Sequence, residues 1–140
     1  KIQDYCQEHF GAKPETVGAL IRCIYESLAM KFRWTVETLE RISGKTLPVI
    51  NMMGGGSKAE MLCQFTANAS GKTVIAGPDE ATAIGNITVQ LIAMGAASTL
   101  EEAKSILAPA SIVREYKPQD HALWDTHYRD YLRLLERSRI

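Results

Sequence analysis

Three consecutive glycines and a serine, Gly54, Gly55, Gly56 and Ser57, stand between an apolar run and an amphipathic one. Glycine lets backbone N–H groups approach a ligand because it has no Cβ, and a following helix N-terminus offers unpaired donors and the positive end of a dipole. A flexible turn combined with such donors suits a phosphate group. These four residues are therefore the first candidate for a binding site.

The residues alone leave three interpretations of this region open. "GGGSKA" over 54–59 satisfies the G-x-G-x-x-A pattern of a dinucleotide-binding turn, with Asp79 and Glu80 near the end of the next predicted strand. "GKT" over 71–73 matches the end of a phosphate-binding P-loop, but Thr66 stands where the first glycine of that motif belongs. In the third interpretation the glycines only permit a tight turn from strand to helix.

The composition favours a folded domain. The chain has 140 residues, about the length of one ordinary domain, and 46% of them are hydrophobic. Lys and Arg together number 16, as do Asp and Glu, so the formal charge of zero indicates neither a nucleic-acid nor a membrane partner. No stretch approaches the roughly 20 apolar residues that span a bilayer. Cys6, Cys23 and Cys63 lack CxxC spacing, which favours reduced thiols in a cytoplasmic protein, each packed as a small core residue.

Apolar periodicity predicts helices on both sides of the glycines. A short helix over 2–10 ends at Gly11, and Pro14 opens a second helix of about 30 residues that ends at Gly44. Further helices are expected from the glycines to about Ser70, over 79–95, over 99–107, and from Pro118 towards the end of the chain.

Several side chains of these helices have expected roles. Asp79 is expected to cap the helix over 79–95, with Glu80 in its first turn, while Thr99 and Glu102 form a capping box. The last helix has an apolar face made by Trp124, Tyr128, Tyr131, Leu132 and Leu135. Beside it lies a row of arginines that we interpret as a solvated face, made by Arg129, Arg133 and Arg137.

Two short apolar runs, 46–53 and 72–78, are expected to be buried strands. With the intervening helix they form a βαβ unit, which predicts an α/β fold with a parallel sheet and a right-handed crossover. Two strands cannot enclose a core of their own. Since the sequence also begins at Lys1 with a helix already under way, it is expected to be a piece of a longer protein.

The region 49–95, "VINMMGGGSKAEMLCQFTANASGKTVIAGPDEATAIGNITVQLIAMG", resembles the C-terminal domain of the FGGY carbohydrate kinases. "GPDEATAIGN" over 77–86 is a sharper sign of this family than the glycines, and "IRCIYESLAMKFRW" over 21–34 adds to it. The resemblance implies an α/β fold that is part of an actin-like, ribonuclease-H-like ATPase domain, with parallel strands and helices on both faces. It also implies that 1–140 is the C-terminal portion of the second, nucleotide-binding domain.

Within this family the residues are most similar to the kinases that act on L-rhamnulose. The resemblance therefore implies ATP-dependent phosphorylation of L-rhamnulose at its 1-hydroxyl, with Mg²⁺. Two alternatives stay open: a family member that acts on xylulose or fuculose, and a non-catalytic nucleotide-binding or assembly module. ATP and the sugar are thus the expected small-molecule partners, and the isolated chain is expected to self-associate because its sheet lacks neighbouring strands.

Carried over by position, Gly54, Gly55, Gly56 and Ser57 match the adenosine loop of the family, in which backbone groups meet the α-phosphate and sugar of the nucleotide. Lys58 is expected to be a solvated surface lysine, and Ala59 has no side chain that could hydrogen-bond an adenine.

The resemblance places the catalytic aspartate upstream of Lys1. We therefore expect no catalytic residue in this chain and no activity of the chain alone. His9, His121 and His127 have no ligand partner one helical turn away, so no metal site is expected.

Overall fold

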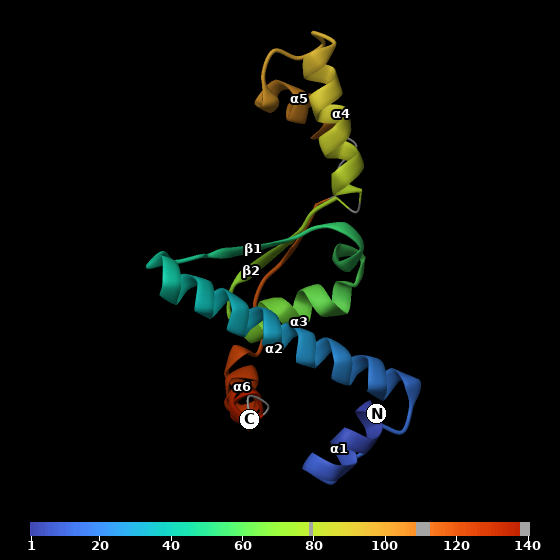
Figure 1. Ribbon diagram of the computed structural model, residues 1–140, viewed down its shortest axis with the longest axis vertical. Helices are drawn as coiled ribbons and strands as arrows, with labels where there is room; N and C mark the ends of the chain where they lie inside the picture. Colours follow the sequence, from blue (N-terminus) through green and yellow to red (C-terminus); the bar gives the residue numbers. More distant parts are fainter. Residues whose placement is uncertain (79, 109–112, 138–140) are drawn as a thin grey trace.

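The computed structural model describes residues 1–78, 80–108 and 113–137. The helices are α1 (Ile2–Phe10), α2 (Val17–Ser43), α3 (Glu60–Ser70), α4 (Ala81–Ala93), α5 (Leu100–Leu107) and α6 (His121–Arg137). The strands are β1 (Val49–Met52), β2 (Thr73–Ala76) and β3 (Arg114–Tyr116), and a short 3₁₀ helix, η1 (Gly54–Lys58), follows β1. In Figure 1, α2 and α3 lie together on one side of the sheet, and α4 and α5 form a separate pair beyond the strand ends.

The long helix α2 begins later than its sequence predicts. Thr16, not Pro14, stands at its start, and the Thr16 hydroxyl accepts a hydrogen bond from the Ala19 N–H at 3.1 Å. Such a side-chain cap satisfies a donor that the first helical turn leaves unpaired. The predicted ends at Gly11 and Gly44 are confirmed, because these residues take left-handed φ angles of 64° and 66°.

The sheet is mixed, whereas the sequence predicts only parallel strands. β1 and β2 are parallel, with Ile50 beside Val74, as the βαβ pattern requires. β3 adds an antiparallel strand on the other side of β2 and brings Tyr116 beside Val74. This third strand was missed because its three residues, two of them charged, show no apolar alternation and lie in what was expected to be a loop.

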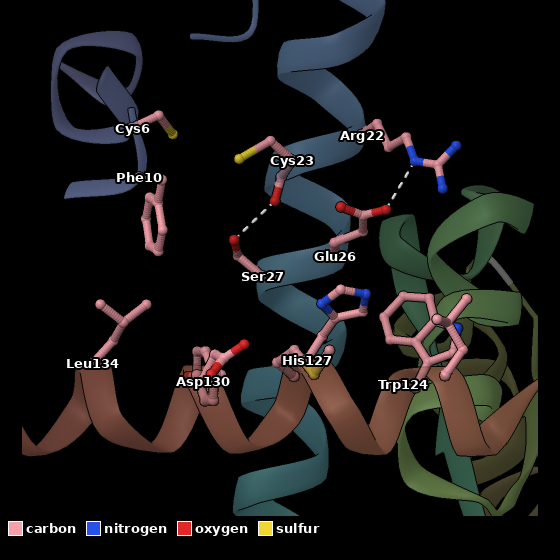
Figure 2. A pocket seen from close by; sticks show the side chains of 13 residues that line it. Cys6, Phe10, Arg22, Cys23, Glu26, Ser27, Trp124, His127, Asp130 and Leu134 are labelled. Atoms are coloured by element: carbon pink, nitrogen blue, oxygen red, sulfur yellow. Dashed lines mark hydrogen bonds and ion pairs between the residues drawn. The ribbon is translucent and has the colours of Figure 1, made fainter. Parts of the chain in front are cut away.

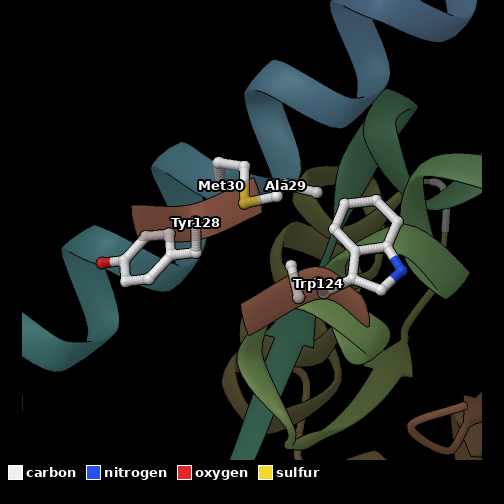
Figure 3. Packing of buried hydrophobic residues seen from close by; sticks show 5 residues of the cluster. Ala29, Met30, Trp124 and Tyr128 are labelled. Atoms are coloured by element: carbon white, nitrogen blue, oxygen red, sulfur yellow. The ribbon is translucent and has the colours of Figure 1, made fainter. Parts of the chain in front are cut away.

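The core lies between α2, α3, α6 and the inner face of the sheet. Figure 3 shows Ala29 and Met30 of α2 packed with Trp124 and Tyr128 of α6, a cluster that also includes Ala69 of α3. A second cluster lies between α3 and the sheet and consists of Cys63, Ala67, Val74 and Ala76, with Ile50, Met52 and Tyr116 packed against it. The predicted apolar face of α6 is confirmed for Trp124, Tyr128, Tyr131 and Leu132, which all belong to or pack against the first cluster.

The opposite face of the sheet is open. Val49 is 41% exposed and Asn51 is also exposed, so alternate residues of β1 point away from the core. The helix α4 is apolar on most sides but buries only Thr88 among its described residues. None of the helices that the structure describes is long and apolar enough to cross a membrane.

The predicted capping box of α5 forms with one difference. The Thr99 hydroxyl accepts from the Glu102 N–H at 3.2 Å, as expected, while the Glu102 carboxylate accepts from the N–H of Ser98, one residue before the cap. The arginines Arg129, Arg133 and Arg137 are exposed, which confirms the solvated face of α6.

Candidate functional site: the glycine turn

The glycine turn, Gly54–Lys58, lies where the parallel strands β1 and β2 both end. One backbone hydrogen bond joins the turn to the residues after β2, from the Gly54 N–H to the Pro78 carbonyl at 3.4 Å, and another joins the end of β1 to them, from the Gly77 N–H to the Met52 carbonyl at 2.7 Å. The carboxyl edge of a parallel sheet is where α/β folds commonly bind ligands. Both segments that the sequence singled out, the glycines and the start of "GPDEATAIGN", therefore meet at one edge.

The glycines of this edge differ in what the fold demands of them. Gly54 has φ 75°, a left-handed conformation that favours glycine. At Gly77, a Cβ would lie 3.3 Å from the Met53 side chain and 3.6 Å from the Met52 carbonyl oxygen, so a side chain there would be tightly packed. Gly55 and Gly56 have no positive φ, and a Cβ on either would meet no atom within 4 Å. The tight-turn interpretation thus accounts for Gly54 but not for Gly55 or Gly56.

Ser57 serves the turn itself. It is only 2% exposed, and its hydroxyl donates to the Gly54 carbonyl at 2.7 Å, which braces the turn from inside. Beneath the turn lies the thiol of Cys63, 3.4 Å from the Met52 sulfur and 3.7 Å from the Ser57 carbonyl oxygen. Burial raises the pKa of Cys63, so this thiol stays protonated and acts as a small packing residue, as predicted.

The residues after the turn lead into α3. Lys58 is exposed, as expected, and Ala59 stands at the helix cap without a side-chain capping hydrogen bond. Glu60, in the first turn of α3, pairs with Arg114 of β3 at 3.1 Å on the surface. The turn is thereby held between β1, β2 and α3, with the outer sides of Gly55 and Gly56 facing open space.

The P-loop interpretation of 71–73 is wrong. Gly71 ends α3 with φ 67° and lies against the ring of His121, and Lys72 pairs with Glu40 of α2 at 2.7 Å. These residues close a helix instead of opening one, so they cannot cradle a phosphate at a helix N-terminus.

The acidic pair after β2, Asp79 and Glu80, was predicted to lie at the start of α4. Asp79, predicted to cap α4, lies outside the described residues. Glu80 stands at the cap position, one residue before the first turn in which it was predicted, and its side chain makes no capping hydrogen bond.

The histidines require one correction. His121 does have a partner one helical turn away, because its Nε2 lies 3.6 Å from an Asp125 oxygen, and its Nδ1 donates to the Asn68 carbonyl at 2.7 Å. Since a carbonyl only accepts, this bond places a proton on Nδ1. Within the described ranges, no three His, Cys, Asp or Glu side chains gather as a metal ion would require.

A cavity of about 430 Å³ lies elsewhere, between α1, α2 and α6. Cys6 and Cys23 line it and are half-buried, so the prediction that all three cysteines are core residues holds only for Cys63. The sequence carried no signal for this cavity, because it depends on the angle at which α1 returns against α2. It is not lined by any residue of the glycine turn.

Comparison with known proteins identifies the class to which this site belongs. Residues 9–94 match the family described as "FGGY family of carbohydrate kinases, C-terminal domain", which is well over half of the chain. The chain therefore belongs to the FGGY family of carbohydrate kinases, and its α/β fold is of the actin-like, ribonuclease-H-like type, as the resemblance implied. This membership removes the dinucleotide-binding interpretation of 54–59.

Several individual relatives of the chain are rhamnulokinases. The chain is 40% identical over 127 residues to a rhamnulokinase of Bacteroides thetaiotaomicron, covering 91% of the chain and 26% of the relative. It is 38% identical to a rhamnulokinase of Halalkalibacterium halodurans and 37% identical to one of Bacillus subtilis, over 120 residues in each case, or 86% of the chain. The chain spans about a quarter of the length of these curated relatives.

Proposed function

We propose that residues 1–140 are the C-terminal portion of the nucleotide-binding domain of a longer carbohydrate kinase, here called the parent, and that the glycine turn holds the adenosine side of ATP. The observation that carries this proposal is the open space beside Gly55 and Gly56. Neither their backbone conformation nor their packing requires glycine, whereas a ligand that lies directly on the main chain does.

Each residue of the turn then has a distinct role. Gly54 makes the left-handed bend, Ser57 locks it through the bond to the Gly54 carbonyl, and Gly55 and Gly56 offer bare main chain to the sugar and α-phosphate of the nucleotide. Bound ATP with Mg²⁺ supplies the phosphoryl group. The chain contributes a rigid, side-chain-free surface, and the base that accepts the proton of the sugar hydroxyl belongs to the rest of the parent, so the chain alone is inactive.

The parent's substrate in this proposal is L-rhamnulose, phosphorylated at its 1-hydroxyl in the cytoplasm. The similarity to three rhamnulokinases at 37–40% identity supports this choice over the xylulose and fuculose kinases of the family.

A coupled assay of the parent with ATP and a panel of ketoses tests the substrate. We expect kcat/KM for L-rhamnulose to exceed that for xylulose and fuculose by at least ten-fold. Comparable kcat/KM values for all three sugars would contradict the choice of L-rhamnulose and support only the assignment to the carbohydrate kinases. No turnover of any sugar, together with retained ATP binding, would instead favour a non-catalytic nucleotide-binding module.

Valine variants of the parent test the glycine turn. Gly55→Val and Gly56→Val place a branched side chain in the open space, so we expect the Kd for ATP to rise at least ten-fold while the Kd for the sugar changes little. Gly18→Val is the matched control, because Gly18 is also exposed, has no positive φ and has only one neighbouring atom, at 4.0 Å. Equal loss of both ligands and of thermal stability in the turn variants, but not in the control, would mean that the glycines serve the fold alone.

A further inference from the structure

The cavity between α1, α2 and α6 has the size and the lining of a small-molecule site. Its volume of about 430 Å³ lies within the range of pockets that bind compact organic ligands. Apolar side chains from all three helices form much of its wall, namely Phe10 of α1, Met30 of α2, and Trp124, Tyr131 and Leu134 of α6. An apolar ligand body placed here would leave water, which favours binding.

Two carboxylates and an imidazole line the same cavity. Figure 2 shows Glu26 on α2 and His127 and Asp130 on α6, directed into the space between the two helices. One oxygen of the Glu26 carboxylate lies 2.8 Å from Nε of Arg22. One oxygen of the Asp130 carboxylate lies 2.8 Å from Nη1 of Arg133. Each of these ion pairs engages one oxygen of a carboxylate, so the other oxygen can accept a hydrogen bond from a ligand.

The arginines that pair with these carboxylates add little positive charge to the cavity. Arg22 is one of the lining residues, but its guanidinium carbon lies 5.7 Å from the centre of the Phe65 ring on α3, and Figure 2 shows it directed away from the cavity. Arg133 does not line the cavity. The charges that face the cavity are therefore mainly negative, and such a lining attracts cations. The faces of the aromatic rings in the wall favour a cation as well.

We propose that this cavity is a binding site for a small hydrophobic amine, whose ammonium group lies among Glu26, His127 and Asp130. The apolar body of the amine packs against the aromatic rings of the wall. The ammonium group donates to the carboxylate oxygens that face it, which selects an amine over an alcohol or an acid of the same shape. No residue of the glycine turn lines the cavity, so this site neither depends on the proposed nucleotide site nor competes with it.

Calorimetric titration of the parent at neutral pH tests the ligand class. The probes are phenethylamine, phenethyl alcohol and phenylacetate, which share a phenyl ring and differ in charge. We expect saturable binding of phenethylamine, and a Kd at least ten-fold higher for the alcohol and for the acid. Equal affinity for the three probes would overturn the selection for an amine. The absence of saturable phenethylamine binding at millimolar concentrations would overturn the site itself.

Variants of the two carboxylates test where the ammonium group lies. Glu26→Gln and Asp130→Asn keep the shape of the side chain but remove its charge, so each should raise the Kd for phenethylamine several-fold. Glu101→Gln is the matched control, because Glu101 is also an exposed acid paired with a basic side chain, Lys104, and lies on α5. The same Kd in all three variants and in the unchanged parent would overturn the placement of the amine. Thermal unfolding without ligand should differ little among them, because all three acids are on the surface.

Leu134→Trp tests the apolar part of the site. The larger side chain takes up space in the cavity, so it should weaken the binding of phenethylamine and of phenethyl alcohol together. Unchanged binding of both probes to Leu134→Trp would show that they bind elsewhere.

A second titration, at a saturating concentration of a non-hydrolysable ATP analogue, separates this site from the glycine turn. The Kd for phenethylamine should stay the same, and it should also stay the same in Gly55→Val whether or not that variant binds the nucleotide. A Kd that rises in proportion to the concentration of the analogue would place the amine at the nucleotide site and overturn the proposal.

Discussion

At the scale of single residues, the glycines of the turn differ in what makes glycine suitable at each position. Gly54 is needed because its φ of 75° is left-handed. Gly55 and Gly56 have ordinary φ angles, and what distinguishes them is the open space beside their main chain. This difference could not be predicted, because adjacent glycines look alike in a sequence. The helix-ending role of Gly11 and Gly44 could be predicted, since each follows directly after an apolar stripe.

Alanine variants separate the two kinds of glycine. Gly54→Ala forces a Cβ into the left-handed region and should lower the free energy of unfolding by about 1–2 kcal/mol. Gly55→Ala should leave it nearly unchanged, because the new methyl group meets no atom within 4 Å. Urea unfolding of the dilute chain, followed by the fluorescence of Trp34 and the buried Trp124, measures both changes in free energy. Equal destabilisation by the two variants would contradict the assignment.

At the scale of elements, Arg33 of α2 joins three helices. Its guanidinium donates to the Ala69 carbonyl of α3 at 2.9 Å and to Asp125 of α6, pairs with Glu37 at 2.8 Å, and lies 4.0 Å from the centre of the Tyr128 ring. The apolar stripe of α2 was predictable from its spacing. This polar contact was not, because its partners lie 36 and 92 residues further along the chain. The strand β3 could not be predicted for the same reason, because it forms by pairing with β2, which lies far away in the sequence.

Removal of this contact should destabilise the helix packing. Arg33→Met keeps much of the side-chain volume but leaves the Ala69 carbonyl and Asp125 without their donor, so we expect a loss of about 1–3 kcal/mol. Tyr128→Phe removes only the bond to Glu37, of 2.7 Å, and should cost about 1 kcal/mol. Urea unfolding at neutral pH measures the loss in free energy of unfolding for both variants. A smaller loss in Arg33→Met than in Tyr128→Phe would show that Arg33 does not hold these helices together.

Acid should weaken the contacts that α2 makes with the rest of the chain. A hydrogen bond from Arg33 lowers the pKa of Asp125, and one from Lys72 lowers the pKa of Glu40, which also accepts the Leu47 N–H before β1. A carboxyl group with a lowered pKa in the folded state stabilises the fold above its ordinary pKa, which is 3.8 for Asp and 4.5 for Glu. That contribution is lost as the pH falls through the folded pKa.

A series of urea unfolding curves from pH 7 to pH 3 measures this loss. We expect the free energy of unfolding to fall below about pH 4.5, and to fall less steeply in Asp125→Asn and Glu40→Gln, which cannot take up the proton. A pH dependence that stays the same in both variants would assign the acid sensitivity to other groups.

At the scale of the whole molecule, exposed apolar surface predicts association. β1 is the edge of the sheet that the described residues form, and Val49 on its outer face is 41% exposed. On α4, which is apolar on most sides, Val89 is 65% exposed, and Met94, which follows the helix at its C-cap, is 80% exposed. Open apolar edges recruit other chains, and a helix without a polar face normally lies inside a larger protein.

Sedimentation of the isolated chain checks this expectation. We expect dimers or larger species that weaken in Val49→Lys, because a charge on an edge strand opposes pairing. Val17→Lys, on α2, is the control, since Val17 is 75% exposed but far from the strand edge in sequence, and it should change nothing. A monomer that unfolds cooperatively would show that the described elements close their own core.

The sequence supported the βαβ unit, the helix ends and the family, because these depend on local spacing and on motifs such as "GPDEATAIGN". It did not support the mixed sheet or the cavity beside Cys6 and Cys23. Those features depend on how distant elements meet, and local periodicity carries no information about that.

Hydrogen exchange of the parent, with and without a non-hydrolysable ATP analogue, tests the central claim most directly. If the glycine turn holds the nucleotide, amides in the segment 53–63 should exchange more slowly at saturating analogue, while those of α1 should not change. Saturation without any slowing in 53–63, accompanied by slowing elsewhere in the parent, would contradict the assignment of the nucleotide to this turn.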